Sequence, residues 1–258
     1  MRTIGPLSPA ALQLLTVLLT ASAAAGESGT PIAMKWMEGD VAGATTIWSA
    51  DGKRVEGFIS YSQHREGDLL SVERVGHFRD GSSDADEATV RVGTRLESVS
   101  GRTTVRDAKG KPVVDFHIDV AAKRLRGFYL DDGERTEVDE EADIGPGTYW
   151  GPLFNLIVKN FDANATDGQL VFQAVIATPK PRVMDMEMTR GGAVTARRTG
   201  GAVEGTRLVM LPTVNFLVDP ILQRLVPKTE FIVTGGSPPA LARFNGPRNY
   251  AGVLIQVE

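Results

Sequence analysis

The chain has 258 residues, of which 42% are hydrophobic and 23% are charged, a composition typical of a globular protein with a sizeable core. The formal net charge is −4, a mildly acidic balance that argues against nucleic acid as a partner. The sequence contains no cysteine, which excludes disulfides, thiol catalysis and a lipid-modified amino-terminal cysteine.

Residues 1–25 have the pattern of a cleavable secretory signal. Arg2 precedes a short apolar run at 10–19, and the small residues at 21–25 fit the A-x-A cleavage rule. No later segment reaches the roughly 18 apolar residues that a membrane-spanning helix needs. We therefore expect a periplasmic protein whose mature chain lacks a transmembrane segment, with residues 26–258 forming a single β-rich domain.

The first half of the mature chain is predicted to be a series of β-strands. Short alternating or β-branched runs are separated there by Gly, Asp and Pro turns. GSSDADE (81–87) is expected to be a polar loop, and the acidic stretch 131–147 a solvated connection, because its spacing does not match a calcium-binding loop. The expected strands are PIAMKWM (31–37), ATTIW (44–48), RVEGFISYS (54–62), LLSVERVGHFR (69–79), TVRVGTRLESV (89–99), RTTVRD (102–107), PVVDFHIDV (112–120) and KRLRGFYLD (123–131).

The apolar period then changes to that of a helix. The large apolar residues of the segment 150–161 are spaced 3, 1, 3, 1 and 3, which predicts one amphipathic helix. Such a helix could plug or cover the open side of a sheet. The residues of this apolar stripe are Trp150, Leu153, Phe154, Ile157, Val158 and Phe161.

Strand patterns resume after the helix. A second short helix is possible at about 217–225, where Leu217, Ile221, Leu222 and Leu225 have helical spacing. The expected strands are QLVFQAVIAT (169–178), RVMDMEMTR (182–190), AVTARRTG (193–200), GTRLVMLPT (205–213), KTEFIVTGG (228–236), PALARFNG (239–246) and GVLIQVE (252–258).

The methionine-rich run RVMDMEMTR is typical of a half-buried strand. Alternation places Met184, Met186 and Met188 on one face and the acidic Asp185 and Glu187 on the other. Thioethers also suit Cu(I), so a soft-metal site is the alternative, with Met34 and Met37 as further sulfur donors. No histidine lies nearby in the sequence, and we expect an apolar interior with neither metal nor cofactor.

Signals for catalysis are weak. The row formed by Asp115, His117 and Asp119 could bind a divalent metal, but it lies opposite the apolar Phe116 and Ile118 and is expected to face water. No G-x-S-x-G, H-E-x-x-H or phosphate-loop motif is present. A hydrolase would therefore need a triad assembled from dispersed residues around one of the three histidines, His64, His77 or His117.

The closing section of the chain resembles a known group of proteins. The strand LARFNGP contains Leu241, Arg243, Phe244 and Gly246, and it is followed by a final apolar strand. This pattern is similar to that of uncharacterised exported bacterial proteins that end in L-x-R-[YF]-x-G and a last strand. The resemblance implies a strongly curved antiparallel sheet, like the half-open barrels of periplasmic lipoprotein carriers. It also places Gly246 in a turn and Phe244 in the core, and it transfers no functional residue.

Together these patterns predict a mainly β fold: a strongly curved antiparallel sheet or half-open barrel holding one amphipathic helix. The leading functional hypothesis is an exported protein that binds a lipid or another hydrophobic molecule, with a cell-envelope protein as a further partner. A ligand-free structural protein of the envelope and a hydrolase are the alternatives. The predicted cavity lining is Met184, Met186, Met188, Trp150, Phe154 and Phe172.

Overall fold

The computed structural model describes residues 28–37, 39–176, 180–198, 201–213, 228–248 and 254–257. Within these residues, 15 strands form one sheet in the order β8-β7-β6-β5-β4-β3-β2-β1-β15-β14-β13-β12-β11-β10-β9. The strands are β1 (Val41–Ser49), β2 (Val55–Glu66), β3 (Leu69–Phe78), β4 (Ser83–Val92), β5 (Leu96–Arg106), β6 (Pro112–Asp119), β7 (Arg124–Asp131), β8 (Glu134–Glu141), β9 (Thr148–Tyr149), β10 (Gln169–Ile176), β11 (Arg182–Arg198), β12 (Gly201–Pro212), β13 (Thr229–Thr234), β14 (Ala240–Pro247) and β15 (Leu254–Val257).

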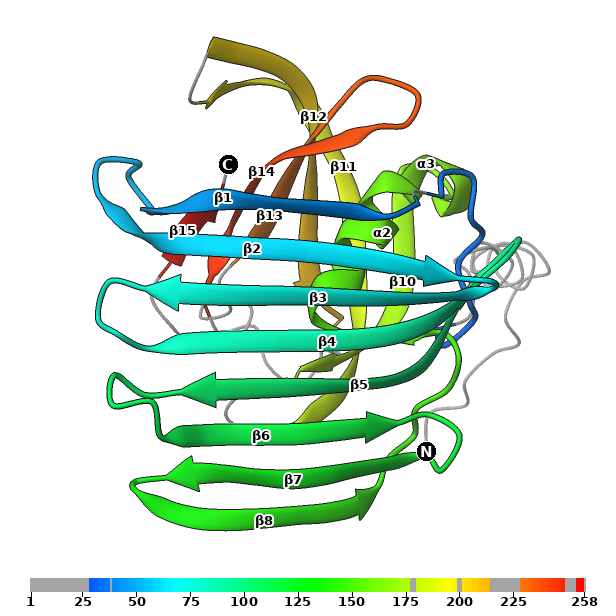
Figure 1. Ribbon diagram of the computed structural model, residues 1–258. Coiled ribbons are helices and arrows are strands. Elements are labelled where there is room, and N and C mark those ends of the chain that lie inside the picture. The colour runs from blue at the N-terminus through cyan, green and yellow to red at the C-terminus, as the bar shows by residue number, and fades with distance from the viewer. Residues whose placement is uncertain are drawn as a thin grey trace, which may run out of the picture.

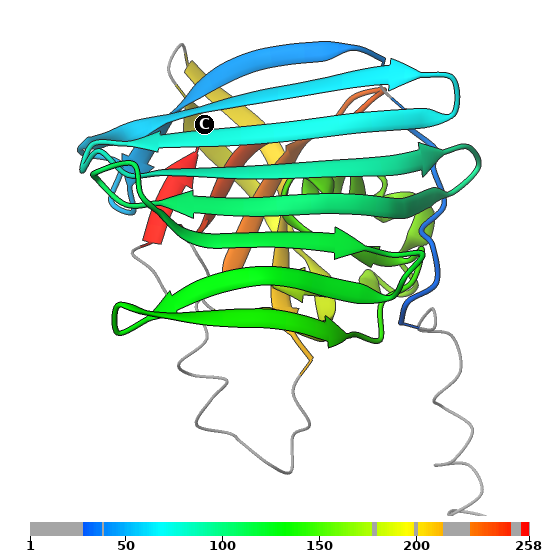
Figure 2. The same ribbon diagram turned by 60° about the horizontal axis from the view of Figure 1, so that its bottom comes forward.

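The strand order divides the sheet into two meanders, which we call the first meander (β1–β8) and the second meander (β9–β15). In Figure 1 the first meander crosses the front of the molecule and the second runs steeply behind it. Figure 2 shows the first meander as a curved layer over the second. The sheet therefore curls so that the two meanders face each other.

The two meanders are joined through strands from opposite ends of the sequence. β1 pairs antiparallel with β15 through Ile47 and Val257, Trp48 and Gln256, and Ser49 and Ile255. β8 and β9 remain as the two edges of the sheet, so the barrel is not closed. All described pairings are antiparallel except that of β9 with β10. The predicted fold class, a curved sheet or half-open barrel, is confirmed.

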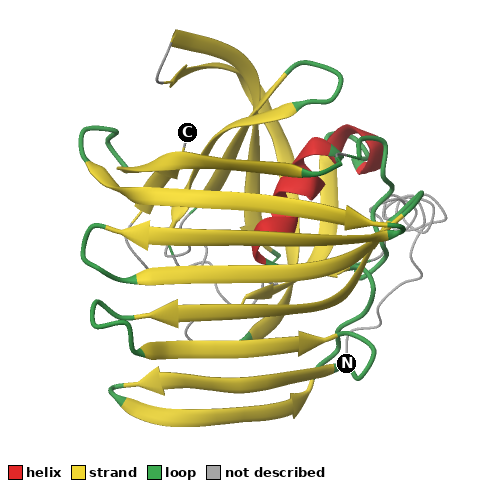
Figure 3. Cartoon of the chain, in the orientation of Figure 1, coloured by secondary structure: helices red, strands yellow, loops and turns green. Residues whose placement is uncertain are grey.

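The predicted helix is confirmed as an interrupted helical segment. A 3-10 turn, η1 (Gly151–Leu153), leads into α2 (Phe154–Lys159), and α3 (Phe161–Asn164) follows. The segment lies between the two meanders (Figure 3). Every residue of the predicted apolar stripe is buried, and Leu156 is buried as well. The segment is thus covered on more sides than an amphipathic surface helix, because the sheet curls around it.

Alternation along the strands explains the core. In β4 the even-numbered residues from Asp84 to Val92 are buried, while their neighbours face outward. The inward-facing residues of both meanders and the helical segment form one large apolar cluster. In β6 the same alternation buries Phe116 and Ile118 and leaves His117 and Asp119 exposed, as the sequence predicts.

The expected strand at 31–37 is wrong. Residues 29 and 33 form only isolated bridges, and the extended segment 33–36 is held instead by side chains of the helical segment. Asn160 Oδ1 accepts hydrogen bonds from the Lys35 and Trp36 amides, both at 2.8 Å, and its Nδ2 donates to Trp36 O at 3.0 Å. Asn164, one helical turn later, binds the Ala33 amide and carbonyl in the same way. Two asparagine side chains therefore replace a neighbouring strand.

Tyr149 ties the β9 edge to the first meander. Its hydroxyl donates a hydrogen bond to Leu96 O and accepts one from the Ile32 amide, both at 2.9 Å. The Ser98 amide also donates to Pro146 O at 2.8 Å. Tyr149 is fully buried, and burial raises the pKa of its hydroxyl above the usual value. The neutral hydroxyl can then serve as donor and acceptor at once.

Two further loop predictions are wrong. GSSDADE contributes Ser83–Glu87 to β4, and the acidic stretch contains the strand β8. Only Val138 of β8 is buried, so its sequence lacks the apolar alternation that would identify a strand. Unpaired edges are often protected from aggregation by charged side chains, and the acidic character of β8 fits its place at the edge of the sheet.

Two details of the second meander also differ from expectation. RVMDMEMTR and AVTARRTG form one strand, β11, with a register shift between Arg190 and Ala193. Gly246 lies inside β14 instead of in a turn, paired with Ile255. A side chain there would clash with the Phe244 ring, since its Cβ would lie 2.6 Å from a ring carbon. Phe244 itself packs against the core, as expected.

The expected signal at residues 1–25 and the helix expected at 217–225 lie outside the described residues. Among the residues that the structure does describe, no helix is both long enough and apolar enough to cross a membrane.

Replacing Asn160 by alanine should lower the free energy of unfolding by about 2–4 kcal/mol, because the backbone of residues 35–36 loses its hydrogen-bond partners. Urea unfolding followed by circular dichroism measures this change. Asn155→Ala, in the same helix but on a half-buried side chain, is the matched control and should lose less than about 1 kcal/mol. Equal losses in the two variants would refute the role of Asn160.

Candidate ligand-binding cavity

A cavity of about 500 Å³ lies between the two meanders and the start of the helical segment. Ligand pockets usually have volumes of about 300–1,000 Å³, so this one is large enough for a small molecule. The chief apolar residues of its wall are Ile59 and Val105 of the first meander, Trp150 and Phe154 of the helical segment, and Phe231 and Leu241 of the second meander.

Trp150 is fixed against the first meander at one side of the cavity. Its indole Nε1 donates a hydrogen bond to Glu87 O at 3.1 Å. The ring lies over Gly101 of β5, where a Cβ would come within 2.4 Å of three ring atoms. The missing side chain at Gly101 thus makes room for the indole, which in turn positions the turn η1 against the inner face of the sheet.

A polar row crosses the otherwise apolar inner face of the first meander. Register places Tyr61, Arg74, Asp86 and Thr103 side by side on β2, β3, β4 and β5, and all four line the cavity. Arg74 donates to Asp86 Oδ2 from Nε at 3.0 Å and from Nη2 at 2.6 Å. Thr103 Oγ1 donates to the other oxygen, Asp86 Oδ1, at 2.8 Å. Both carboxylate oxygens of Asp86 are therefore satisfied.

Arg74, the cation of this row, is stabilised by the carboxylates of Asp84 and Asp86. The Arg74 side chain is 22% exposed, and Asp84 Oδ1 lies 3.3 Å from its Nη2. Burial by itself would lower the pKa of Arg74, but the charges of Asp86 and Asp84 and the hydrogen bonds to Asp86 raise it above the usual value. Arg74 therefore stays charged.

Asp84 differs from Asp86, although both residues point inward from β4. Asp84 is only 6% exposed, and its Oδ1 accepts no well-aligned hydrogen bond from the described residues. Burial raises the pKa of this carboxyl, an effect that the nearby Arg74 opposes and the charge of Asp86 reinforces. Asp84 thus supplies the cavity wall with a carboxyl group that is buried but incompletely bonded.

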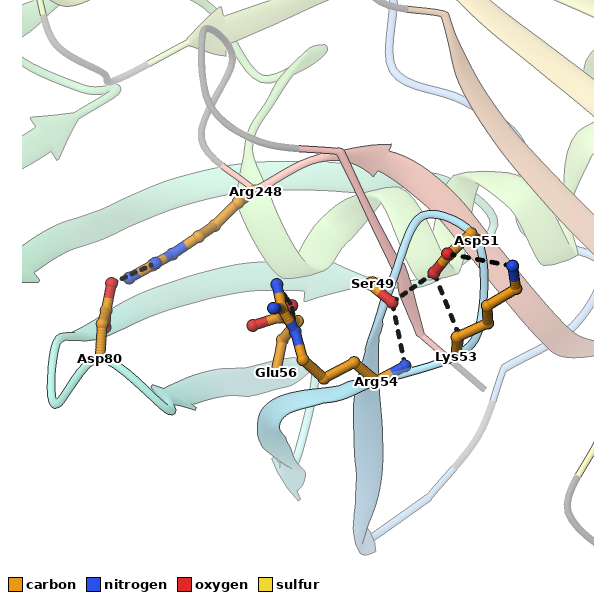
Figure 4. Close-up of polar contacts among 7 residues, drawn as sticks. All are labelled: Ser49, Asp51, Lys53, Arg54, Glu56, Asp80 and Arg248. Atoms are coloured by element: carbon orange, nitrogen blue, oxygen red, sulfur yellow. Dashed lines mark hydrogen bonds and ion pairs between the residues drawn. The ribbon is translucent and has the colours of Figure 1, made fainter.

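Arg248 joins the two meanders beside the cavity. It follows β14, and its Nη1 lies 3.0 Å from Asp80 Oδ2 in the turn between β3 and β4 (Figure 4). The guanidinium carbon also lies 3.3 Å from the centre of the Phe78 ring, and a further hydrogen bond reaches Ser82. Hydrogen bonds from Ser82, and then from Arg248, lower the pKa of Asp80 to about 2. Asp80 is therefore ionised and holds Arg248 at the cavity wall.

The hairpin between β1 and β2 has its own hydrogen-bond network, also drawn in Figure 4. Asp51 Oδ1 accepts from Ser49 Oγ at 2.6 Å and from the Lys53 amide at 3.1 Å. Ser49 Oγ in turn accepts from the Arg54 amide at 3.0 Å. These bonds fix the turn after β1, the strand that carries Gly43, Ala44 and Thr45 along the cavity.

Of the six residues predicted to line a cavity, two line it and four lie in or against the packed core. Trp150 and Phe154 line it. Met186, Met188 and Phe172 are buried in the apolar core, and Met184 packs against that core while partly exposed. Met188 lies opposite Leu170 and Met210, and Met186 opposite Phe172, so the neighbours of the methionine face are apolar side chains.

Sequence reasoning missed the polar wall, because Asp84 and Asp86 were assigned to a loop. The signal was present in DADEATVRV: Asp84, Asp86, Ala88, Val90 and Val92 alternate with outward-facing residues and so share one face. The buried alternation of Ala88, Val90 and Val92, continued toward the start of the strand, places the two aspartates on the inner face.

The histidines lie on the outer face of the first meander. His64 and His117 line a polar groove there, together with Arg102 and Arg126. Over the described ranges, no hydrogen bond joins a serine hydroxyl to a histidine ring. The same ranges contain no group of three or more His, Asp or Glu residues that could hold a metal ion.

No known family model matches the chain, and no curated protein matches it in sequence. Two solved structures are similar in shape. A β-barrel-like protein of the domain of unknown function DUF1849 from Brucella abortus aligns with a TM-score of 0.46 and 8% identity, covering 89% of this chain and 97% of that one. A DUF1089 family protein from Pseudomonas aeruginosa aligns with a TM-score of 0.36 and 12% identity, covering 86% and 97%.

The variant Asp84→Asn should become more stable relative to the wild type as the pH rises. Because the pKa of Asp84 in the folded protein is raised above that of an ordinary aspartate, the stability that this carboxyl contributes at low pH is lost as the pH increases through its folded pKa. Asparagine carries no such penalty. We expect the difference in melting temperature, variant minus wild type, to grow between about pH 4 and about pH 8.

Differential scanning fluorimetry over that pH series measures this difference. Asp131→Asn, at an exposed position at the end of β7, is the control and should show a smaller change. A difference for Asp84→Asn that is constant, or that shrinks with rising pH, would contradict the effect of burial on this carboxyl.

Proposed function

We propose that the protein binds a lipid or another hydrophobic small molecule in the cavity between its two meanders. The observation that carries this proposal is the cavity itself, about 500 Å³ of space walled by both meanders and the helical segment. Protein interiors are normally packed to the density of organic crystals. A space of this size in an otherwise apolar interior therefore favours a bound molecule.

The composition of the wall supports the same proposal. Aromatic and aliphatic side chains such as Ile59, Phe154, Phe231 and Leu241 would contact an apolar chain or ring. Ligand sites usually combine such surfaces with a few convergent polar groups, and the row of Arg74, Asp86 and Thr103 supplies these on one wall. The helical segment would act as a plug beside the ligand.

The cellular setting belongs to the proposal as well. The signal-like residues 1–25 suggest that the protein works after export, in the periplasm, where a water-insoluble molecule needs a carrier. A protein of the cell envelope would then deliver or receive the ligand. A ligand-free structural role is the competing hypothesis, and it predicts that the purified protein binds no apolar molecule in a saturable way.

A pair of threonine variants tests the site. Thr45 lines the cavity from β1, whereas the adjacent Thr46 points to the other face of the same strand, opposite the exposed Phe58. Thr45→Phe should fill part of the cavity and weaken binding of the uncharged fluorophore N-phenylnaphthylamine about tenfold, which corresponds to about 1.4 kcal/mol. Thr46→Phe adds the same ring outside the cavity and should bind like the wild type.

Fluorescence titration gives both affinities, and circular dichroism confirms that both variants are folded. No saturable binding by the wild type, or equal weakening by the two variants, would refute the proposal. Native mass spectrometry of protein purified from its own periplasm then identifies what occupies the cavity. A co-purified lipid supports transport, and an empty protein that also fails to bind the fluorophore supports the structural hypothesis.

A further inference from the structure

Several polar residues of the cavity wall lie together on the first meander. Asp84, Asp86 and Thr103 are each less than a tenth exposed, and Arg74, opposite Asp86 on the neighbouring strand, contacts both aspartates. The wall contributed by the second meander and the helical segment is mainly apolar there, with Phe154 and Phe231. A ligand in this cavity would therefore meet the polar row on one side and the apolar Phe154 and Phe231 opposite, as an amphipathic molecule requires. Arg243 and Arg248 also border the cavity from the second meander.

Asp86 and Asp84 differ in how fully their carboxylate oxygens are hydrogen-bonded. Asp86 accepts bonds at both oxygens from Arg74 and Thr103. Asp84 Oδ1 is buried and has only the ion-pair contact of 3.3 Å with Arg74 Nη2. A buried polar atom without a well-formed hydrogen bond destabilises the folded state, and a ligand group that bonds to the Asp84 carboxyl group would reduce that cost.

The charges around Asp84 select the kind of group. An anionic head group would approach the carboxyl groups of Asp84 and Asp86, and like charges repel each other. A cationic head group would approach Arg74 and Arg248, both of which line the cavity and already pair with a carboxylate. An uncharged hydroxyl avoids both penalties, and it can accept from a protonated carboxyl or donate to an ionised one.

We infer that the ligand is a neutral amphipathic molecule whose hydroxyl-bearing head group hydrogen-bonds to Asp84, with its apolar part directed toward Phe154 and Phe231. This inference rests on the proposed function, because it needs the cavity to be a binding site. It adds the ligand class and the residue that selects the head group.

Competition among three molecules with the same apolar chain tests the inference. Dodecanol, dodecanoate and dodecylamine differ only in the charge and chemistry of the head group. Each is titrated, below its solubility limit or micellar concentration and at neutral pH, against wild-type protein loaded with N-phenylnaphthylamine. Dodecanol should displace half of the fluorophore at a concentration about tenfold lower than either charged molecule. Equal displacement by all three would overturn the inference.

Asp84→Leu tests the role of the carboxyl. The measured quantity is the ratio of the half-displacement concentrations of dodecanoate and dodecanol, which does not depend on a general loss of affinity. This ratio should fall about fivefold or more in Asp84→Leu, because leucine cannot hydrogen-bond to the hydroxyl and does not repel a carboxylate. If Asp84→Leu does not fold, Asp84→Ala is measured in its place.

Two further variants complete the design. Asp84→Asn should retain the preference for dodecanol over dodecylamine, because an amide both donates and accepts hydrogen bonds. Glu87→Leu removes an acidic side chain from the outer face of the same strand and should leave every ratio unchanged. An unchanged ratio in Asp84→Leu would refute the inference while leaving the binding function intact. Absence of saturable fluorophore binding by the wild type would refute both.

Discussion

The pairing of β1 with β15 is the constraint on which the rest of the structure depends. Among the described residues, three residue pairs connect these strands, and they turn two meanders into one continuous sheet. Because the sheet continues through this junction and twists, its two halves come to face each other. The helical segment lies between them (Figure 1). The cavity lies where that segment begins. Without this junction the molecule would have two sheets with four exposed edges.

The buried polar groups fall into two kinds. Asn160 and Tyr149 use their hydrogen-bonding groups fully and connect the helical segment, the edge of the sheet and the segment 33–36. Such satisfied groups define one arrangement of the interior. Asp84 is satisfied only in part, although it lies in the same interior. A simple architectural role explains Asn160 and Tyr149, whereas it does not explain a buried carboxyl group at a cavity wall.

The sequence was sufficient for the fold class, because alternation and turn residues repeat through most of the chain. It was not sufficient where a strand lacks apolar alternation, as in the acidic β8, or where an apolar segment has no neighbouring strand, as at 31–37. The latter depends on Asn160, which is distant in sequence and whose partners only the fold brings near. The polar row was missed because charged residues are normally outside.

The residues of the candidate site could also be predicted only in part from the sequence. Trp150 and Phe154 could be predicted because the helix pattern is strong and an enclosed helix must touch the sheet. For the methionines, the inward face was correctly identified, and Met186 and Met188 are buried. What alternation cannot tell is which part of an inner face meets packed side chains and which part meets a cavity. That distinction depends on how the second meander is placed against the first.

The junction of β1 and β15 also has a consequence for the order of folding. Contacts between residues far apart in sequence form slowly, because a long intervening chain must first be ordered. Each meander can assemble from local hairpins, but the junction requires strands from near both ends of the chain. The cavity needs walls from both meanders, so it is complete only in molecules in which the two meanders have come together. A ligand that binds there stabilises that joined state and, with it, the pairing of β1 with β15.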